Sequence, residues 1–121
     1  LAFVGLADRR TTPVADLTLV EQRRLEIARA LASDPTLVLL DEPAAGMTPV
    51  EVDGLIDLVR TVRDQGTTVL LVEHHMRLVM TVADTVTVLK TGRVLAQGKP
   101  AEIQEHPEVI AAYLGNEGWA F

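Results

Sequence analysis

The chain has 121 residues, of which 48% are hydrophobic and 23% charged, with a formal net charge of -6 and no cysteine. This length allows one domain with a sizeable core, and no apolar run approaches the roughly 18 residues of a membrane span. The acidic balance and the lack of a long Lys/Arg cluster argue against a nucleic-acid-binding face, and disulfides and a thiol nucleophile are excluded.

The chain opens on Leu1 in mid-pattern, without an initiator Met or a signal peptide, so we expect it to be part of a longer protein. Its first apolar patch predicts a helix end near Gly5, and a polar loop follows over residues 8–16.

The segment from Thr18 to Glu21 has the Thr-x-x-Glu form of a capping box and predicts a helix that runs to about Ala32. Free N–H groups and the positive dipole end at the start of this helix suit an anion. The spacing is equally compatible with the alternative that Thr18 only caps the helix.

Residues 37–42 read Leu-Val-Leu-Leu-Asp-Glu, and four consecutive aliphatic residues predict a strand that is buried on both faces of a parallel sheet. Asp41 and Glu42 stand where this strand ends, and ligands bind beyond the carboxyl ends of the strands in such sheets. The alternative is that the acidic pair simply begins a solvated loop. Pro43 then stops the strand.

Residues 69–74, Val-Leu-Leu-Val-Glu-His, repeat this pattern. A second capping box, Thr48 to Glu51 with Pro49 in the first helical position, begins a helix between the two strands that ends at Gly66. One face of this helix is apolar: Val52, Leu55, Ile56, Val59 and Val62. Because the resulting βαβ unit has parallel strands, we expect Asp41, Glu42 and His74 to converge on one rim of the sheet.

The remaining chain predicts a short helix over residues 75–83, with Met76, Val79 and Met80 facing inward. Residues 85–89 and 94–96 predict a hairpin at the sheet edge, with its turn at 91–93. Two short helices over 100–105 and 107–114 and a loose tail over 115–121 complete the chain.

Four ordered motifs resemble the ATP-binding cassette (ABC) ATPases. Residues 37–43 resemble the family's Walker B strand, 22–31 the helix after its signature sequence, 45–48 its D-loop and 72–74 its switch-histidine segment. Residues 42–46, 72–80 and 106–115 further resemble the Liv-type ATPases of branched-chain amino-acid importers.

The resemblance implies a role for each matching residue. Asp41 would hold Mg²⁺ through water, Glu42 would polarise the attacking water, and His74 would contact the γ-phosphate of ATP. Thr18, Val20 and Glu21 occupy the signature position, which faces a partner's ATP, and Gly46, Met47 and Thr48 belong to the D-loop. A competing interpretation makes Glu73, His74 and His75 metal ligands, although neighbours on a strand point to opposite faces.

Two departures from the family pattern stand out. No Gly-x-x-x-x-Gly-Lys-Ser/Thr loop occurs in the sequence, so this chain alone is expected to be inactive in ATP hydrolysis. The family's signature reads Leu-Ser-Gly-Gly-Gln, whereas residues 17–21 read Leu-Thr-Leu-Val-Glu, and the side chains of Leu19 and Val20 enter space that glycines leave open for phosphate.

We therefore predict an α/β fold, a P-loop NTPase-like parallel sheet flanked by helices, with an edge hairpin and short C-terminal helices. Residues 1–17 would end a helical subdomain, 18–98 would form the ATPase core, and 99–121 the C-terminal helices and tail.

The resemblance implies the ATP-binding subunit of an amino-acid importer, located at the cytoplasmic face of the inner membrane. Its expected partners are a second ATPase subunit, bound head to tail, and a membrane permease, with no nucleic acid. Two alternatives remain open: a non-catalytic nucleotide-binding scaffold subunit, and a soluble ABC ATPase that is not linked to transport.

Overall fold

The computed structural model describes residues 1–114 and divides the chain into two compact units, Leu1–His74 and His75–Phe121. The described part contains no helix that is both long and apolar enough to cross a membrane. The predicted tail at 115–121 lies outside the described residues, and the predicted boundaries at residues 17 and 98 remain predictions.

The first unit begins with three short 3-10 helices, η1 (Ala2–Val4), η2 (Ala7–Arg9) and η3 (Val14–Asp16). Gly5 ends η1 in the left-handed conformation, with φ 75°, which confirms the helix end expected there. The segment predicted as a polar loop thus contains two helical turns, which satisfy backbone groups locally.

Two longer helices of this unit, α1 (Leu19–Leu31) and α2 (Pro49–Asp64), start where the capping boxes predict. In each, the N-cap threonine accepts a hydrogen bond from the N–H of the glutamate three residues on, and that glutamate accepts one from the threonine N–H. All five predicted apolar positions of α2 are buried, together with Leu58. Periodicity therefore predicted the packing face correctly.

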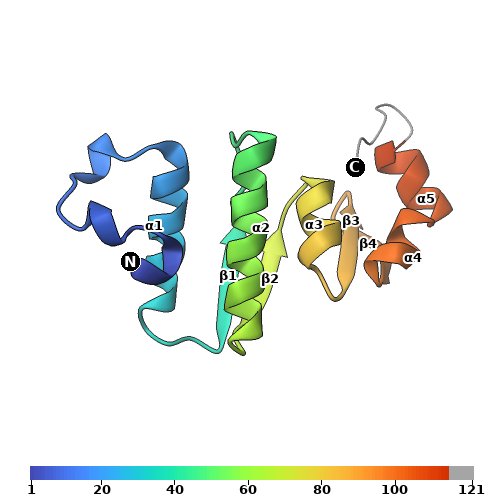
Figure 1. The fold of residues 1–121 in the computed structure, drawn as a ribbon. Helices are drawn as coiled ribbons and strands as arrows, with labels where there is room; N and C mark the ends of the chain where they lie inside the picture. The colour runs from blue at the N-terminus through green and yellow to red at the C-terminus, as the bar shows by residue number, and fades with distance from the viewer. Residues whose placement is uncertain (115–121) are drawn as a thin grey trace. The chain divides into compact units, whose positions relative to one another are not determined.

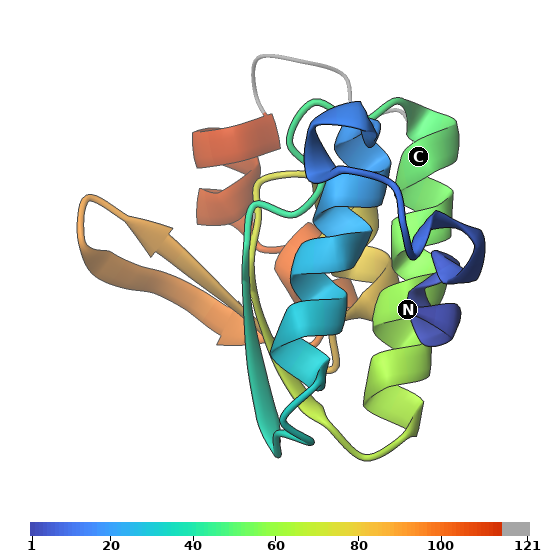
Figure 2. The ribbon, with the colours of Figure 1, turned by 90° about the vertical axis from the view of Figure 1, so that its left-hand side faces the viewer.

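The strands β1 (Leu37–Asp41) and β2 (Thr68–Val72) are parallel neighbours with α2 as their crossover, which confirms the βαβ unit (Figures 1 and 2). Their burial differs from the prediction. Val38 is 3% exposed, but Leu39 is 66% and Leu70 56% exposed. In Figure 2, α2 lies to one side of the two strands, and no other part of residues 1–74 covers the opposite face, so this face stays open.

The second unit contains α3 (Met76–Val82), β3 (Val86–Lys90), β4 (Arg93–Gly98), α4 (Pro100–Gln104), α5 (Pro107–Val109) and the π-helix η4 (Ile110–Leu114). The hairpin is confirmed, and Thr91 and Gly92 both have positive φ, as a two-residue type I′ turn requires. The prediction that the hairpin extends the edge of the sheet is wrong, because within the described residues β3 and β4 pair only with each other. The buried side chains of the hairpin pack against the short helices of their own unit.

The core of the second unit joins the hairpin to the short helices through Val86, Ala96, Ile103 and Val109. The predicted inner face of α3 is confirmed for Val79 and Met80, which are partly buried and pack against this core. The most deeply buried positions of the helix are, however, Leu78 and Val82, which the sequence prediction did not name. Leu78 and Val82 are four residues apart and so lie on one face of the helix.

Candidate functional site

The carboxyl ends of β1 and β2 form one rim, which carries the predicted acidic and histidine side chains. The register pairs Asp41 with Val72, and the Glu42 N–H continues the ladder by donating to the Val72 carbonyl at 2.8 Å. This alignment brings His74 Nδ1 to 3.6 Å from Glu42 Oε1. The two side chains are 80% and 55% exposed. The predicted convergence of Glu42 and His74 is thus confirmed.

Glu42 has an unusual backbone conformation. Its φ of 45° lies in the left-handed region, which non-glycine residues enter at a cost of roughly 1–3 kcal/mol. Both of its backbone polar groups are bonded, the N–H to Val72 and the carbonyl to the Ala45 N–H at 3.1 Å. The sequence predicted that the strand ends at Asp41 and Glu42, and β1 does end at Asp41, because the chain turns at Glu42.

Glu73 is a rim residue to which the sequence interpretation gave no role beyond a possible metal ligand. Its Oε1 accepts the Ala44 N–H at 2.8 Å and its Oε2 accepts the His74 N–H at 3.0 Å. The sequence offers only one signal for this role of Glu73, namely that it is a carboxylate at a strand end, directly before a candidate histidine. The partner, Ala44, lies 29 positions away in the chain.

The predicted D-loop residues form a turn that leads directly into α2. The Met47 N–H donates to the Ala44 carbonyl at 3.1 Å, Gly46 has φ 77°, and Thr48 caps the helix. A Cβ built on Gly46 would lie 3.0 Å from Leu19 Cδ2. The glycine of the predicted D-loop thus packs against Leu19, which belongs to the predicted signature segment.

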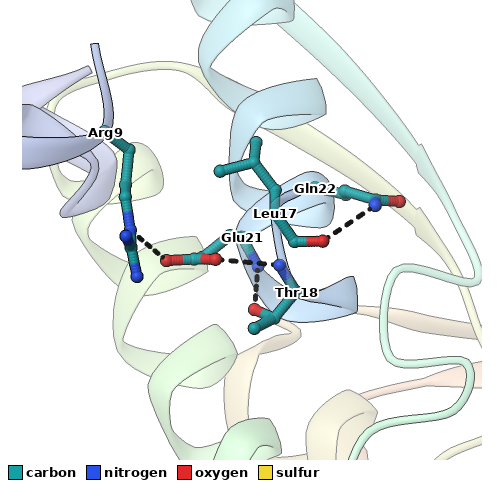
Figure 3. Close-up of polar contacts among 5 residues, drawn as sticks. All are labelled: Arg9, Leu17, Thr18, Glu21 and Gln22. Carbon is teal, nitrogen blue, oxygen red and sulfur yellow. Dashed lines mark hydrogen bonds and ion pairs between the residues drawn. The ribbon is translucent and has the colours of Figure 1, made fainter. Parts of the chain in front are cut away.

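At the predicted signature position, the start of α1, the side chains of Thr18 and Glu21 accept backbone N–H groups of the same segment (Figure 3). Glu21 Oε2 accepts the Thr18 N–H at 2.8 Å, and Arg9 Nε donates to Glu21 Oε1 at 2.8 Å. The hydrogen bond from the Thr18 backbone, followed by that from Arg9, lowers the pKa of the Glu21 carboxyl. A carboxylate therefore occupies donors that an incoming anion would need.

Asp41 is an exposed carboxylate at the strand end and offers the oxygen donor that a hard cation such as Mg²⁺ prefers. Residues 1–114 contain no group of three His, Cys, Asp or Glu side chains that could hold a metal ion. A single carboxylate fits Mg²⁺ that keeps several waters and takes its other ligands from phosphates.

The competing metal-ligand interpretation of residues 73–75 loses support from the same contacts. Glu73 accepts two backbone N–H groups, and His75 Nδ1 accepts the Leu78 N–H as the cap of α3. His74 is paired with Glu42.

Two families match parts of the sequence: residues 1–45 match "ABC transporter", and residues 93–118 match "Branched-chain amino acid ATP-binding cassette transporter". The chain is 44% identical over 116 residues to the high-affinity branched-chain amino acid transport ATP-binding proteins LivG of Salmonella typhimurium and BraF of Pseudomonas aeruginosa. Each alignment covers 95% of this chain and 46% of the relative, so the chain spans about half the length of these relatives.

A further relative is the lipopolysaccharide export system ATP-binding protein LptB of Acidithiobacillus ferridurans, 41% identical over 97% of this chain and 48% of that protein. Among solved structures, the ADP conformation of an ATP-binding cassette of an ABC transporter superposes with TM-score 0.87 and 27% identity, over 96% of this chain and 47% of the other. Part of an ABC transporter complex from Clostridium perfringens gives TM-score 0.81 and 32% identity, over 92% and 45%. The chain belongs to the ATP-binding cassette transporter ATPase family.

Proposed function

We propose that the complete protein is the ATP-hydrolysing subunit of an importer for branched-chain amino acids. The observation that carries this proposal is the pair of Glu42 and His74, held 3.6 Å apart at the carboxyl ends of two parallel strands. The match of residues 93–118 to the branched-chain amino acid transporter family supports the substrate class.

In this proposal, Glu42 orients and polarises the attacking water, and His74 contacts the terminal phosphate of ATP. Asp41 holds the water shell of Mg²⁺, which when bound neutralises phosphate charge. Gly46, Met47 and Thr48 form the D-loop. Thr18, Val20 and Glu21 face the nucleotide of a second ATPase subunit, bound head to tail. The ATPase subunit lies at the cytoplasmic face of the inner membrane, and an integral membrane permease is its coupled partner.

A second candidate function is a non-catalytic, nucleotide-binding scaffold subunit. The observation that favours it is the carboxylate of Glu21, which occupies the Thr18 N–H and carries a negative charge toward the place where a phosphate would approach. The exposed Glu42 and His74 side chains favour hydrolysis instead.

The deciding experiment compares ATP turnover and nucleotide binding of the complete gene product with those of a Glu42→Gln variant. We expect turnover to fall by roughly 10² to 10⁴, the contribution of a well-placed general base, while nucleotide binding is retained. Asp64→Asn is the matched control, because its side chain is 67% exposed against 55% for Glu42. Asp64 ends α2 shortly before β2 begins, so it lies at the opposite end of the strands from the rim.

Nucleotide binding without turnover in the unsubstituted protein would replace hydrolysis with the scaffold function. The substrate is tested separately, by leucine uptake in cells that lack the gene. Uptake restored by the gene, but not by its Glu42→Gln form, supports the amino-acid assignment, and uptake that is unaffected by deleting the gene contradicts it.

A further inference from the structure

The Glu73 carboxylate spans the two chain segments that leave the rim. Its two oxygens accept the N–H of Ala44, two residues after Glu42, and the N–H of His74 itself. We propose that Glu73 is a positioning residue, whose carboxylate fixes Glu42 and His74 relative to each other. This inference rests on the proposed ATPase function.

The Ala44 N–H needs this acceptor. Ala44 is buried, and an unsatisfied buried N–H is more costly than a single hydrogen bond is stabilising. The same turn carries Glu42 in its left-handed conformation, which persists only where the surroundings hold it. The Glu73 oxygen thus stabilises the turn that aims the Glu42 side chain.

The hydrogen bonds of Glu73 also continue the connection between β1 and β2 beyond the end of their backbone ladder. Within residues 1–114, the backbone ladder of β1 and β2 ends with the bond from the Glu42 N–H to the Val72 carbonyl. Glu73 then links the two segments through its side chain at 2.8 and 3.0 Å. The N–H of His74 is held by one oxygen of the Glu73 carboxylate and the N–H of Ala44 by the other, so a shift of one segment moves the other.

A comparison with a helix-capping glutamate separates positioning from simple stabilisation. Glu51 also accepts two hydrogen bonds, from the N–H and the hydroxyl of Thr48, but both partners lie three residues away in the same cap. Glu73 reaches a residue 29 positions away. Glutamine removes one carboxylate oxygen and the negative charge at either position, but Glu51 accepts both of its hydrogen bonds at Oε2 alone. Of the two glutamates, only Glu73 connects the Glu42 turn to His74.

The test measures kcat and KM for ATP and the thermal midpoint of the complete gene product, with Glu73→Gln, Glu73→Asp and, as the matched control, Glu51→Gln. We expect Glu73→Gln to lower kcat about tenfold, as the loss of one charge-assisted hydrogen bond would, with little change in KM. Glu51→Gln should lower the midpoint and leave kcat unchanged. Glu73→Asp keeps the charge but shortens the reach, so its kcat should lie between those of Glu73→Gln and the unsubstituted protein.

A His74→Ala background provides the sharper test. If Glu73 fixes the position of His74 relative to Glu42, this effect is already lost in the His74→Ala variant. Glu73→Gln should then lower kcat much less in that background than in the unsubstituted protein. The inference is overturned if Glu73→Gln keeps the original kcat, or if it costs the same factor in both backgrounds. If Glu73→Gln does not fold, an unchanged kcat in Glu73→Asp overturns it. The proposed ATPase function is tested separately from this inference. It stands if the unsubstituted protein turns over ATP and the Glu42→Gln variant does not, whatever the Glu73 variants show.

Discussion

The strand-end rim and the start of α1 both carry glutamates in family motifs, but they use the carboxylates differently. At the rim, Glu42 has both backbone groups bonded to the chain and a side chain that is more than half exposed beside His74. At the start of α1, the Glu21 side chain is itself the acceptor, bound to the Thr18 N–H and to Arg9. The Glu42 carboxylate therefore remains available for chemistry, whereas the Glu21 carboxylate is already bonded to the start of its own helix.

This difference shows how the same residue type acquires opposite roles. A backbone donor that is satisfied by another backbone group leaves the nearby side chain free, as the Val72 carbonyl does for Glu42. Where no backbone acceptor reaches the N–H, as at a helix N-terminus, a side chain takes its place and is no longer available to a ligand. The three predictions below test this comparison, from the largest expected effect to the smallest.

Replacing His74 with alanine should have the largest effect, because it removes the partner of Glu42 and the proposed phosphate contact. We expect turnover of the complete gene product to fall by roughly 10² to 10³, as for the loss of one preorganised donor at a reacting oxygen. Phosphate release at saturating ATP is the measurement.

The adjacent His75 is the matched control for this change. Its Nδ1 accepts the Leu78 N–H at 3.4 Å and caps α3, so His75→Ala should lower the thermal midpoint and leave turnover nearly unchanged. Equal losses of turnover in the two variants would mean that His74 has only a structural role.

Removing a side chain and a negative charge from the start of α1 should have a smaller effect than His74→Ala. It should strengthen ATP-dependent dimerisation. Val20→Gly with Glu21→Gln removes a side chain and a negative charge from the position that would face a partner's nucleotide. We expect ATP-dependent dimerisation to tighten about fivefold, the effect of removing one like charge at about 4 Å in water. Light scattering with and without ATP measures it.

The double variant also weakens the start of α1, because it adds a glycine and removes a negative charge from the first turn. Val50→Gly with Glu51→Gln, the same change at the start of α2, is therefore its control for helix fraying. If dimerisation weakens equally in both variants, helix stability and not the charge of Glu21 controls it. The proposed difference between the rim and the start of α1 would then be wrong.

The smallest effect concerns acid stability. The Thr48 backbone N–H, and then its hydroxyl, lower the pKa of Glu51 from its ordinary 4.5, and Glu21 is lowered by Thr18 and Arg9. A lowered folded-state pKa stabilises the protein above the unfolded value, and this contribution is lost as the pH falls through the folded value.

Glu51→Gln should therefore lower the thermal midpoint at pH 7, and the difference from the unsubstituted protein should shrink as the pH drops below 4.5. Thermal melts over a pH series measure this. A difference that is constant down to low pH would show that the charge of Glu51 contributes nothing to the cap.

Several features could be predicted from sequence because they depend on neighbours in the chain. The helix starts at Thr18 and Thr48 follow from residues three positions apart, and the buried face of α2 follows from helical periodicity. The parallel pairing of β1 and β2, and hence the meeting of Glu42 and His74, followed from two similar strands around one crossover helix.

Other features were decided only by the tertiary structure. The apolar run of β1 predicts burial on both faces, but burial depends on which elements cover the sheet, and Leu39 stays exposed. The left-handed Glu42 and the bridge from Glu73 to Ala44 are not encoded by any local pattern. They arise because folding brings two strand ends together. There the N–H of Ala44 needs an acceptor and finds it in Glu73, which lies 29 positions away in the chain.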